Sequence, residues 1–97
     1  MDQEVYEILK SFDISDLEIK DVLAVAPMME DVSCDEFAMN CFLLKKHGYP
    51  DSDLDVLFLA NPNIFVKDAE ELETELENLK AQYGDIETVL KQDPMII

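Results

Sequence analysis

Apolar residues along the chain recur mainly at intervals of three and four positions, which is the spacing of one face of an α-helix. This pattern predicts helices over about residues 2–11, 15–26, 33–48, 50–61, 68–83 and 86–93. No long alternation of apolar and polar residues indicates a β-strand, and no hairpin dipeptide separates two apolar runs. We therefore expect an all-α fold of five or six helices.

Local signals mark the ends of these helices. A capping box, in which an N-cap side chain is followed three residues later by glutamate, is expected in Ser15–Glu18, Ser33–Glu36 and Asp68–Glu71. Prolines 27, 62 and 94 stop three helices, because proline withholds a donor and moves the preceding residue out of the α region.

The apolar positions also predict a core. Val56 and Leu59 make the helix that begins at Pro50 apolar nearly all round, so we expect it to be buried between its neighbours. Tyr83 extends the apolar stripe of the long acidic helix before it. Both features place these side chains inside the molecule.

The proline stops recur at a nearly constant interval. Pro27 and Pro62 are 35 residues apart, and Pro94 follows 32 residues later. At these offsets Ile19, Leu54 and Ile86 fall in one column, and the two apolar columns beside it continue in register. Units of this kind bury their apolar faces by stacking, so we expect one helical-repeat domain, a short solenoid with units of about 1–32, 33–67 and 68–97.

Charge limits the classes of partner. The chain has 23 Asp and Glu against seven Lys and no Arg, and its net charge is −16. Nucleic-acid binders carry a basic surface that neutralises phosphates, so this balance disfavours nucleic acid and, equally, anionic membrane surfaces. A protein with a basic surface is the partner that the charge favours, and no small-molecule substrate is inferred.

Seven acidic residues fall at equivalent positions of the predicted repeat. Glu18, Asp53 and Asp85 share one column, and two further pairs share others; the whole candidate partner-docking strip is Asp16, Glu18, Asp51, Asp53, Asp55, Asp85 and Glu87. Stacked units would align these carboxylates along one edge. The alternative is that they only offset the helix dipole, since acidic residues favour any first helical turn.

Motifs for catalysis, cofactors and metals are missing from the sequence. Phosphate-binding glycine loops, HExxH and GxSxG do not occur, and Cys34, Cys41 and His47 lack zinc-ligand spacing. We expect Cys34 and Cys41 to be reduced thiols and His47 to lie at the C-terminus of a helix. We expect no catalytic, metal-binding or cofactor-binding residue. The acidic N-terminal segment is unlike a signal peptide, and a cytoplasmic protein is expected.

Three segments carry a resemblance to a known family. "GYPDSDLDVLFLANPNIF" and "YGDIETVLKQDPMII" combine a short apolar helix, a proline break and a Gly-Tyr or Tyr-Gly turn, and "FDISDLEIKDVLAVAPMM" is a weaker copy. This pattern resembles the repeat of the mitochondrial transcription termination factor (mTERF) family. The resemblance implies a left-handed superhelix, whereas the sequence alone leaves its handedness open, and it suggests a short acidic prokaryotic or phage relative.

The chain departs from that family in its charge. The resemblance implies nucleic-acid binding along a basic groove, but the seven lysines are scattered and arginine is absent. The leading hypothesis is therefore a non-catalytic protein-interaction module whose acidic surface docks a basic or nucleic-acid-binding protein. A nucleic-acid-binding regulator is the alternative, and an enzyme or metal protein is disfavoured.

Overall fold

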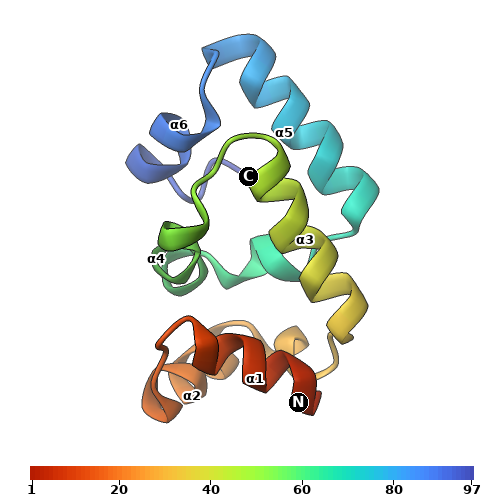
Figure 1. Cartoon of the computed structure of the whole chain (residues 1–97), viewed down its shortest axis with the longest axis vertical. Coiled ribbons are helices and arrows are strands. Elements are labelled where there is room, and N and C mark those ends of the chain that lie inside the picture. Colours follow the sequence, from red (N-terminus) through yellow and green to blue (C-terminus); the bar gives the residue numbers. More distant parts are fainter.

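The computed structural model describes residues 1–97 and contains six α-helices and three short 3₁₀-helices, without a β-strand (Figure 1). In chain order these are α1 (Gln3–Ser11), α2 (Asp16–Val25), η1 (Pro27–Glu30), α3 (Cys34–Lys46), η2 (Asp51–Asp53), α4 (Leu54–Ala60), η3 (Pro62–Val66), α5 (Ala69–Tyr83) and α6 (Ile86–Gln92). The predicted all-α fold is confirmed. None of the helices is both long enough and apolar enough to span a lipid bilayer.

Side-chain caps fix where three of the long helices begin. At the start of α2, the Glu18 N–H donates to Ser15 Oγ over 3.2 Å, and the Ser15 N–H donates to the Glu18 carboxylate over 3.1 Å. Ser33 and Asp68 cap α3 and α5 by accepting from the backbone N–H three residues later. The capping box is therefore complete at α2, whereas α3 and α5 form only its first half.

The three proline stops share one local backbone geometry. The residue before each proline lies outside the helical region, with φ/ψ of −134°/71° at Ala26, −148°/81° at Asn61 and −142°/83° at Asp93. The N–H of each still donates to the carbonyl four residues earlier, over 2.8, 2.8 and 2.9 Å. Pro27 and Pro62 then begin the 3₁₀-helices η1 and η3, so that the chain changes direction before each long helix.

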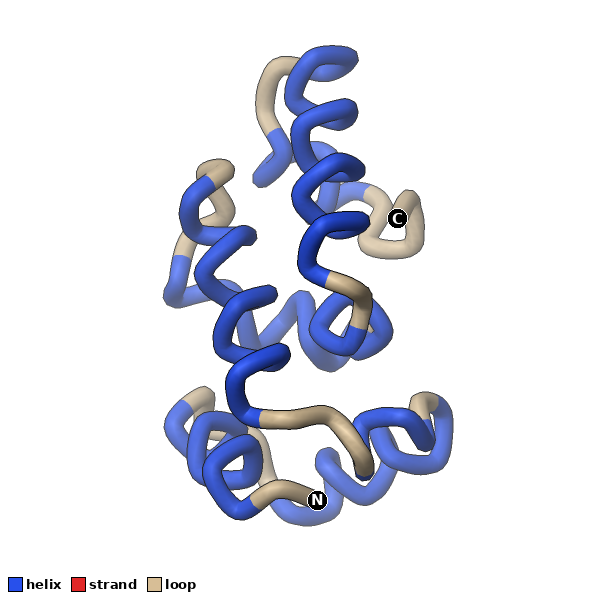
Figure 2. Tube along the Cα trace, turned by 90° about the vertical axis from the view of Figure 1, so that its right-hand side faces the viewer, coloured by secondary structure: helices blue, strands red, loops and turns tan.

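Two long helices form the centre of the molecule. α3 packs against both α5 and η3, and α6 packs against α5. Figure 2 shows α3 and α5 side by side along the long axis of a body that measures 36 × 23 × 21 Å. α1 and α2 lie at one end of this axis, and the turn between α5 and α6 lies at the other (Figure 1).

The core contains a cluster of three phenylalanine rings. Phe37 of α3, Phe58 of α4 and Phe65 of η3 are fully buried, with ring centroids 5.4–6.0 Å apart. Offset and edge-on contacts of this kind add to the stabilisation that apolar burial provides. The predicted column of Ile19, Leu54 and Ile86 is also buried, as the apolar spacing indicated.

Two buried asparagines connect elements across the core. Asn40 of α3 donates through Nδ2 to the carbonyl oxygens of Ile64, at 3.3 Å, and Lys67, at 2.9 Å. Asn61 donates through Nδ2 to the Pro94 carbonyl over 2.9 Å. Because a buried amide left unpaired is costly, these bonds fix the position of η3 against α3 and of the C-terminal segment against the middle of the chain.

Three further expectations from the sequence need correction. The helix predicted from Pro50 begins as η2 and becomes α-helical only at Leu54. Val56 and Leu59 are 60% and 40% exposed, because the seven-residue α4 packs only one side against η3 and α3. Tyr83 is also exposed, since it ends α5 beside the left-handed Gly84, where α5 extends beyond its neighbours (Figure 1).

Both cysteines lie in α3 as free thiols. Cys41 is buried, and this burial raises its pKa to about 12. Cys34, at the first position of the helix, is half-buried, and a hydrogen bond with Glu4 is the main cause of its raised pKa. Thiols with raised pKa values are poor nucleophiles and poor metal ligands, because both roles need the thiolate.

Candidate functional site

Two carboxylates of the predicted strip form capping hydrogen bonds at the N-termini of helices. Glu18 completes the capping box of α2, and its hydrogen bonds with Ser15 lower its pKa. Asp85 accepts from the Glu87 N–H at 3.0 Å and from Thr88 Oγ1 at 2.9 Å, which caps α6. These are the contacts that the helix-dipole alternative predicts for acidic residues at such positions.

Asp16 accepts side-chain hydrogen bonds at the junction of α1 and α2. Its carboxylate accepts from the Tyr6 hydroxyl and from Lys10 Nζ, the latter at 3.2 Å. The hydrogen bond with Tyr6, followed by that with Lys10, lowers the pKa of Asp16. Asp16 therefore helps to connect α1 with α2, and it is the member of the strip with a tyrosine partner.

Lys91 joins two members of the strip that are distant in sequence. Its Nζ lies 2.8 Å from Asp53 of η2 and 2.9 Å from Glu87, one turn earlier on α6. The hydrogen bond with Asp53, and then that with Glu87, raises the pKa of Lys91. The structure thus brings Asp53 and Glu87 together, but with their charges partly neutralised by a shared lysine.

Asp51 and Asp55 line an acidic hollow between the end of α1 and the start of α4. Its volume is about 450 Å³, and it is bordered by Ser11, Phe12, Asp13, Asp51, Ser52 and Asp55. Asp51 lies 3.6 Å from Lys45, whereas Asp13 and Asp55 form no ion pair. We call this surface the acidic hollow; of its three carboxylates only that of Asp51 forms an ion pair.

The sequence analysis missed Asp13 as a member of this hollow. Asp13 has no equivalent in the predicted repeat, and it occupies the turn between α1 and α2 with a φ of 67°. Aspartate is one of the few residues other than glycine that tolerate this left-handed conformation. The sequence around Asp13 therefore indicates only a turn. The tertiary fold places that turn beside η2.

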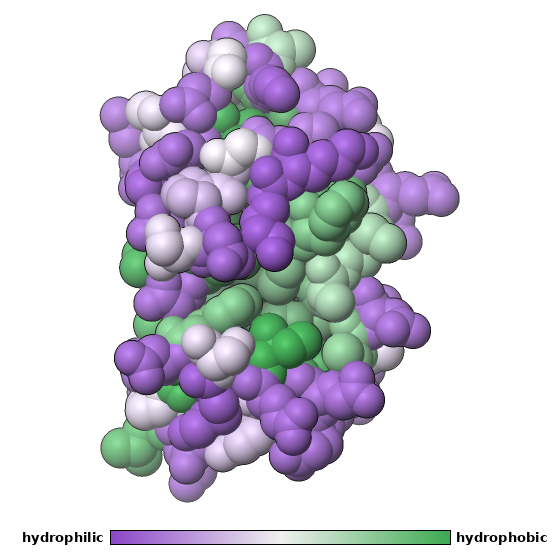
Figure 3. Space-filling model, viewed as in Figure 1, coloured by the Kyte–Doolittle hydropathy of each residue, from purple (hydrophilic) through white to green (hydrophobic).

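Exposed apolar side chains accompany the acids. Val25 of α2 and Leu59 of α4 border a smaller hollow of about 340 Å³, together with Glu18, Asp21 and Val22. Figure 3 shows apolar side chains gathered in a depression across the middle of one face, with hydrophilic side chains on both sides of it. Apolar and acidic side chains therefore border the same hollow on this part of the surface.

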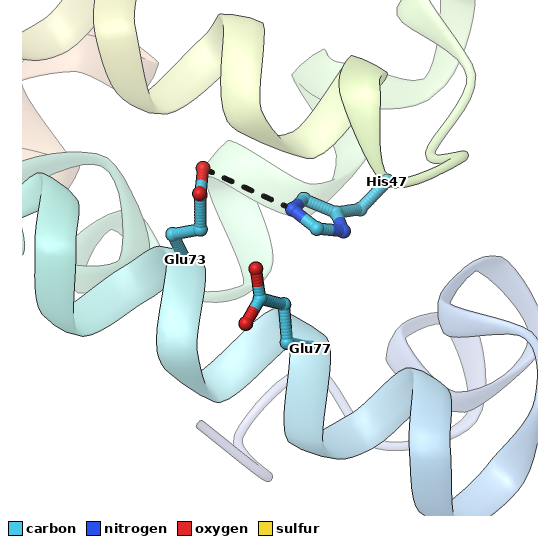
Figure 4. Close-up of side chains that lie close together, drawn as sticks. All are labelled: His47, Glu73 and Glu77. Carbon is cyan, nitrogen blue, oxygen red and sulfur yellow. Dashed lines mark ion pairs between the residues drawn. The ribbon is translucent and has the colours of Figure 1, made fainter.

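A second group of polar side chains lies between the end of α3 and the middle of α5. His47 caps the C-terminus of α3, and its side chain is 9% exposed. Its Nε2 atom is buried without a hydrogen-bond partner and lies 4.0 Å from Glu73 Oε2. Glu77 follows one turn later on α5, and the nearest ligand atoms of the three residues lie within 4.8 Å of one another (Figure 4).

Sequence reasoning did not connect these three residues. His47 was expected to be a helix C-terminal group, and it does occupy that position. Glu73 and Glu77 belong to an acidic helix whose spacing gives no sign of a metal site; Glu73 is only half-exposed and also pairs with Lys46 at 3.4 Å. Only the packing of α3 on α5 brings residues so distant in sequence together.

Comparison of the chain with protein-family models, with curated proteins and with solved structures finds no match.

Proposed function

We propose that this chain is a non-catalytic interaction module that binds a basic protein through its acidic surface, with the acidic hollow as the docking point. The observation that carries the proposal is the clustering of Asp13, Asp51 and Asp55 around one hollow, where only Asp51 forms an ion pair, with Lys45. Carboxylates that lack cations in their own chain are available to lysine and arginine side chains of a partner.

Charge supports the same partner class over longer distances. A net charge of −16 on 97 residues gives the chain a strong negative field that attracts cationic proteins before contact. Such attraction speeds association and weakens as salt screens it. The free thiols of Cys34 and Cys41 fit the reducing cytoplasm, which we propose as the location.

We also propose that the fold is a left-handed repeat of about three units, as the mTERF resemblance implies. The shared backbone geometry before the three prolines supports repetition, as does the order of short helix, 3₁₀-helix and long helix at both Pro27 and Pro62. A solved structure of the chain, superposed on itself with an offset of about one unit, tests the repetition. Units that fail to superpose would contradict it.

Nucleic-acid binding is the second candidate, and the repeated backbone geometry is the observation that favours it. The lysines argue against nucleic-acid binding, because five of them already form ion pairs with carboxylates of this chain: Lys10, Lys45, Lys46, Lys67 and Lys91. A gel-shift series with duplex DNA and RNA at about 50 mM salt distinguishes the candidates, because low salt strengthens any phosphate contact. Retardation at micromolar protein would favour nucleic acid over a basic protein.

The docking proposal is tested by affinity capture from an extract of the source organism. The site variant is Asp13→Asn/Asp55→Asn, and the matched control is Asp31→Asn/Glu36→Gln, which removes two charges from exposed positions near the start of α3. We expect the wild type and the control variant to retain one or more basic proteins. The site variant should not retain them.

Binding of the captured protein is then measured at several salt concentrations with all three forms. A selective loss of affinity in the site variant supports the acidic hollow. Equal loss in both variants would assign the binding to net charge alone, and capture of no basic protein would contradict the proposed function.

A further inference from the structure

The Nε2 atom of His47 is a buried polar atom without a hydrogen-bond partner. Its side chain is 9% exposed, so bulk water does not compensate for the missing bond. Buried polar atoms in folded proteins are almost always paired, and one that is not calls for a specific explanation. A neutral imidazole with a free nitrogen in this position has the lone pair that a metal ion requires.

Two carboxylates face that nitrogen. Glu73 and Glu77 are four residues apart on α5, which places them on the same face of the helix. Figure 4 shows both carboxylates directed toward the imidazole, with Glu73 Oε2 at 4.0 Å from Nε2. The backbone N–H of His47 donates to the Leu43 carbonyl over 3.1 Å, and this bond holds the His47 backbone at the end of α3.

We propose that His47, Glu73 and Glu77 bind a divalent transition-metal ion, with Zn²⁺ as the best match. Imidazole nitrogen and carboxylate oxygen both bind zinc, and three protein ligands leave the fourth position of a tetrahedral site open. A histidine ligand argues against Mg²⁺ and Ca²⁺, which prefer oxygen ligands alone. Sequence spacing indicated no metal ligands, because these residues meet only when α3 packs on α5.

Binding requires only small movements. Ligand atoms that are each about 2.0–2.1 Å from a tetrahedral zinc ion lie about 3.3 Å apart. The distance of 4.0 Å between His47 and Glu73 must therefore shorten by about 0.7 Å, and any pair at the limit of 4.8 Å by about 1.5 Å. The glutamate side chains have the rotational freedom to do this, and Glu73 would exchange its contact with Lys46 for the metal. The open coordination position would face the adjoining hollow of about 350 Å³, which Glu73, Glu77 and Met39 help to line.

The inference is tested by titrating Zn²⁺ alone into the chelator-treated, tag-free chain and measuring the heat of binding. We expect one ion per chain, and a dissociation constant at least about tenfold weaker in His47→Gln and in Glu77→Gln. Glu70→Gln is the matched control, because it removes the same charge from α5 at the edge of the same hollow. We expect this control to stay within about threefold of the wild type.

A second readout uses the fact that His47 is the only histidine. Its imidazole nitrogens give a single set of NMR signals, and one equivalent of Zn²⁺ should shift the Nε2 signal whereas Mg²⁺ should not. Circular dichroism checks that each variant keeps its helices. An unchanged Nε2 signal at saturating Zn²⁺ would overturn the proposal, as would wild-type affinity in His47→Gln or an equal loss in Glu70→Gln.

Discussion

The Nζ atom of Lys91 on α6 lies 2.8 Å from Asp53 Oδ2 on η2 and thus joins the last helix to the middle of the chain. Glu87 holds the same lysine from within α6. Both partners are partly exposed to solvent, where an ion pair contributes little to stability.

We therefore expect Asp53→Asn to lower the melting temperature by no more than a few degrees, because Glu87 still holds the Lys91 ammonium. The difference from wild type should shrink as salt is added. Thermal unfolding followed by circular dichroism measures both effects. A large loss that persists in high salt would mean that Asp53 has a structural role beyond this pair.

Burial predicts a marked difference between two core substitutions. Leu57 is 1% exposed in the middle of the chain, whereas Val89 on α6 is only partly buried. We expect Leu57→Ala to reduce the free energy of unfolding by about 2–5 kcal/mol, because the change removes most of a side chain that is almost fully buried. Val89→Ala should cost about 1 kcal/mol, since its site can relax or admit water. Urea denaturation provides both values, and a neutral Leu57→Ala would contradict the observed core.

Excess negative charge makes stability dependent on salt. With a net charge of −16, folding brings like charges together, and salt screens their repulsion over a Debye length of about 8 Å at physiological strength. We expect the melting temperature to rise when NaCl increases from about 50 to 500 mM. A flat or falling trend would indicate that the ion pairs and helix termini already compensate the acidic residues.

The capping box of α2 gives a prediction for pH. Hydrogen bonds with Ser15 hold the pKa of Glu18 below its ordinary value of 4.5. A lowered folded-state pKa means that this contribution to stability is complete above pH 4.5 and is lost as the pH falls through the lower folded value.

NMR titration of the side-chain carboxyl carbons measures this pKa. Ser15→Ala removes the hydroxyl but keeps the backbone N–H of residue 15, which is the main cause of the lowered Glu18 pKa. The Glu18 pKa should therefore return only part of the way toward 4.5, and α2 should fray at its first turn. Glu36 provides the internal control, because its carboxylate receives no return bond from Ser33. A Glu18 pKa that is the same in both forms would assign the whole shift to the backbone N–H of residue 15 and none of it to the hydroxyl.

The sequence predicted the features that depend on neighbouring residues. Ser15, Pro27 and Pro62 act within one turn of themselves, so their effects on helix starts and stops could be inferred from spacing alone. The burial of Ile19, Leu54 and Ile86 followed from helical periodicity in the same way. Local chemistry and apolar spacing were therefore enough for the all-α fold.

Features that depend on packing could not be predicted in this way. Val56 is apolar but exposed, because no other element covers the outer side of α4. Asp13 reaches the acidic hollow, and His47 approaches Glu73, only through the relative placement of helices. Single-sequence spacing carries no information on which helix faces meet, and so the candidate sites were only partly foreseen.

Asn40 has a consequence for how the molecule opens in solution. Its amide is bonded to two carbonyls that lie on η3 and just before α5, so separating either from α3 exposes unpaired groups in the core. We therefore expect α3, η3 and α5 to open as one cooperative unit under native hydrogen exchange, with similar protection of their amide protons. α1 and α2, which lie at one end of the long axis, should exchange earlier and independently of that unit (Figure 1).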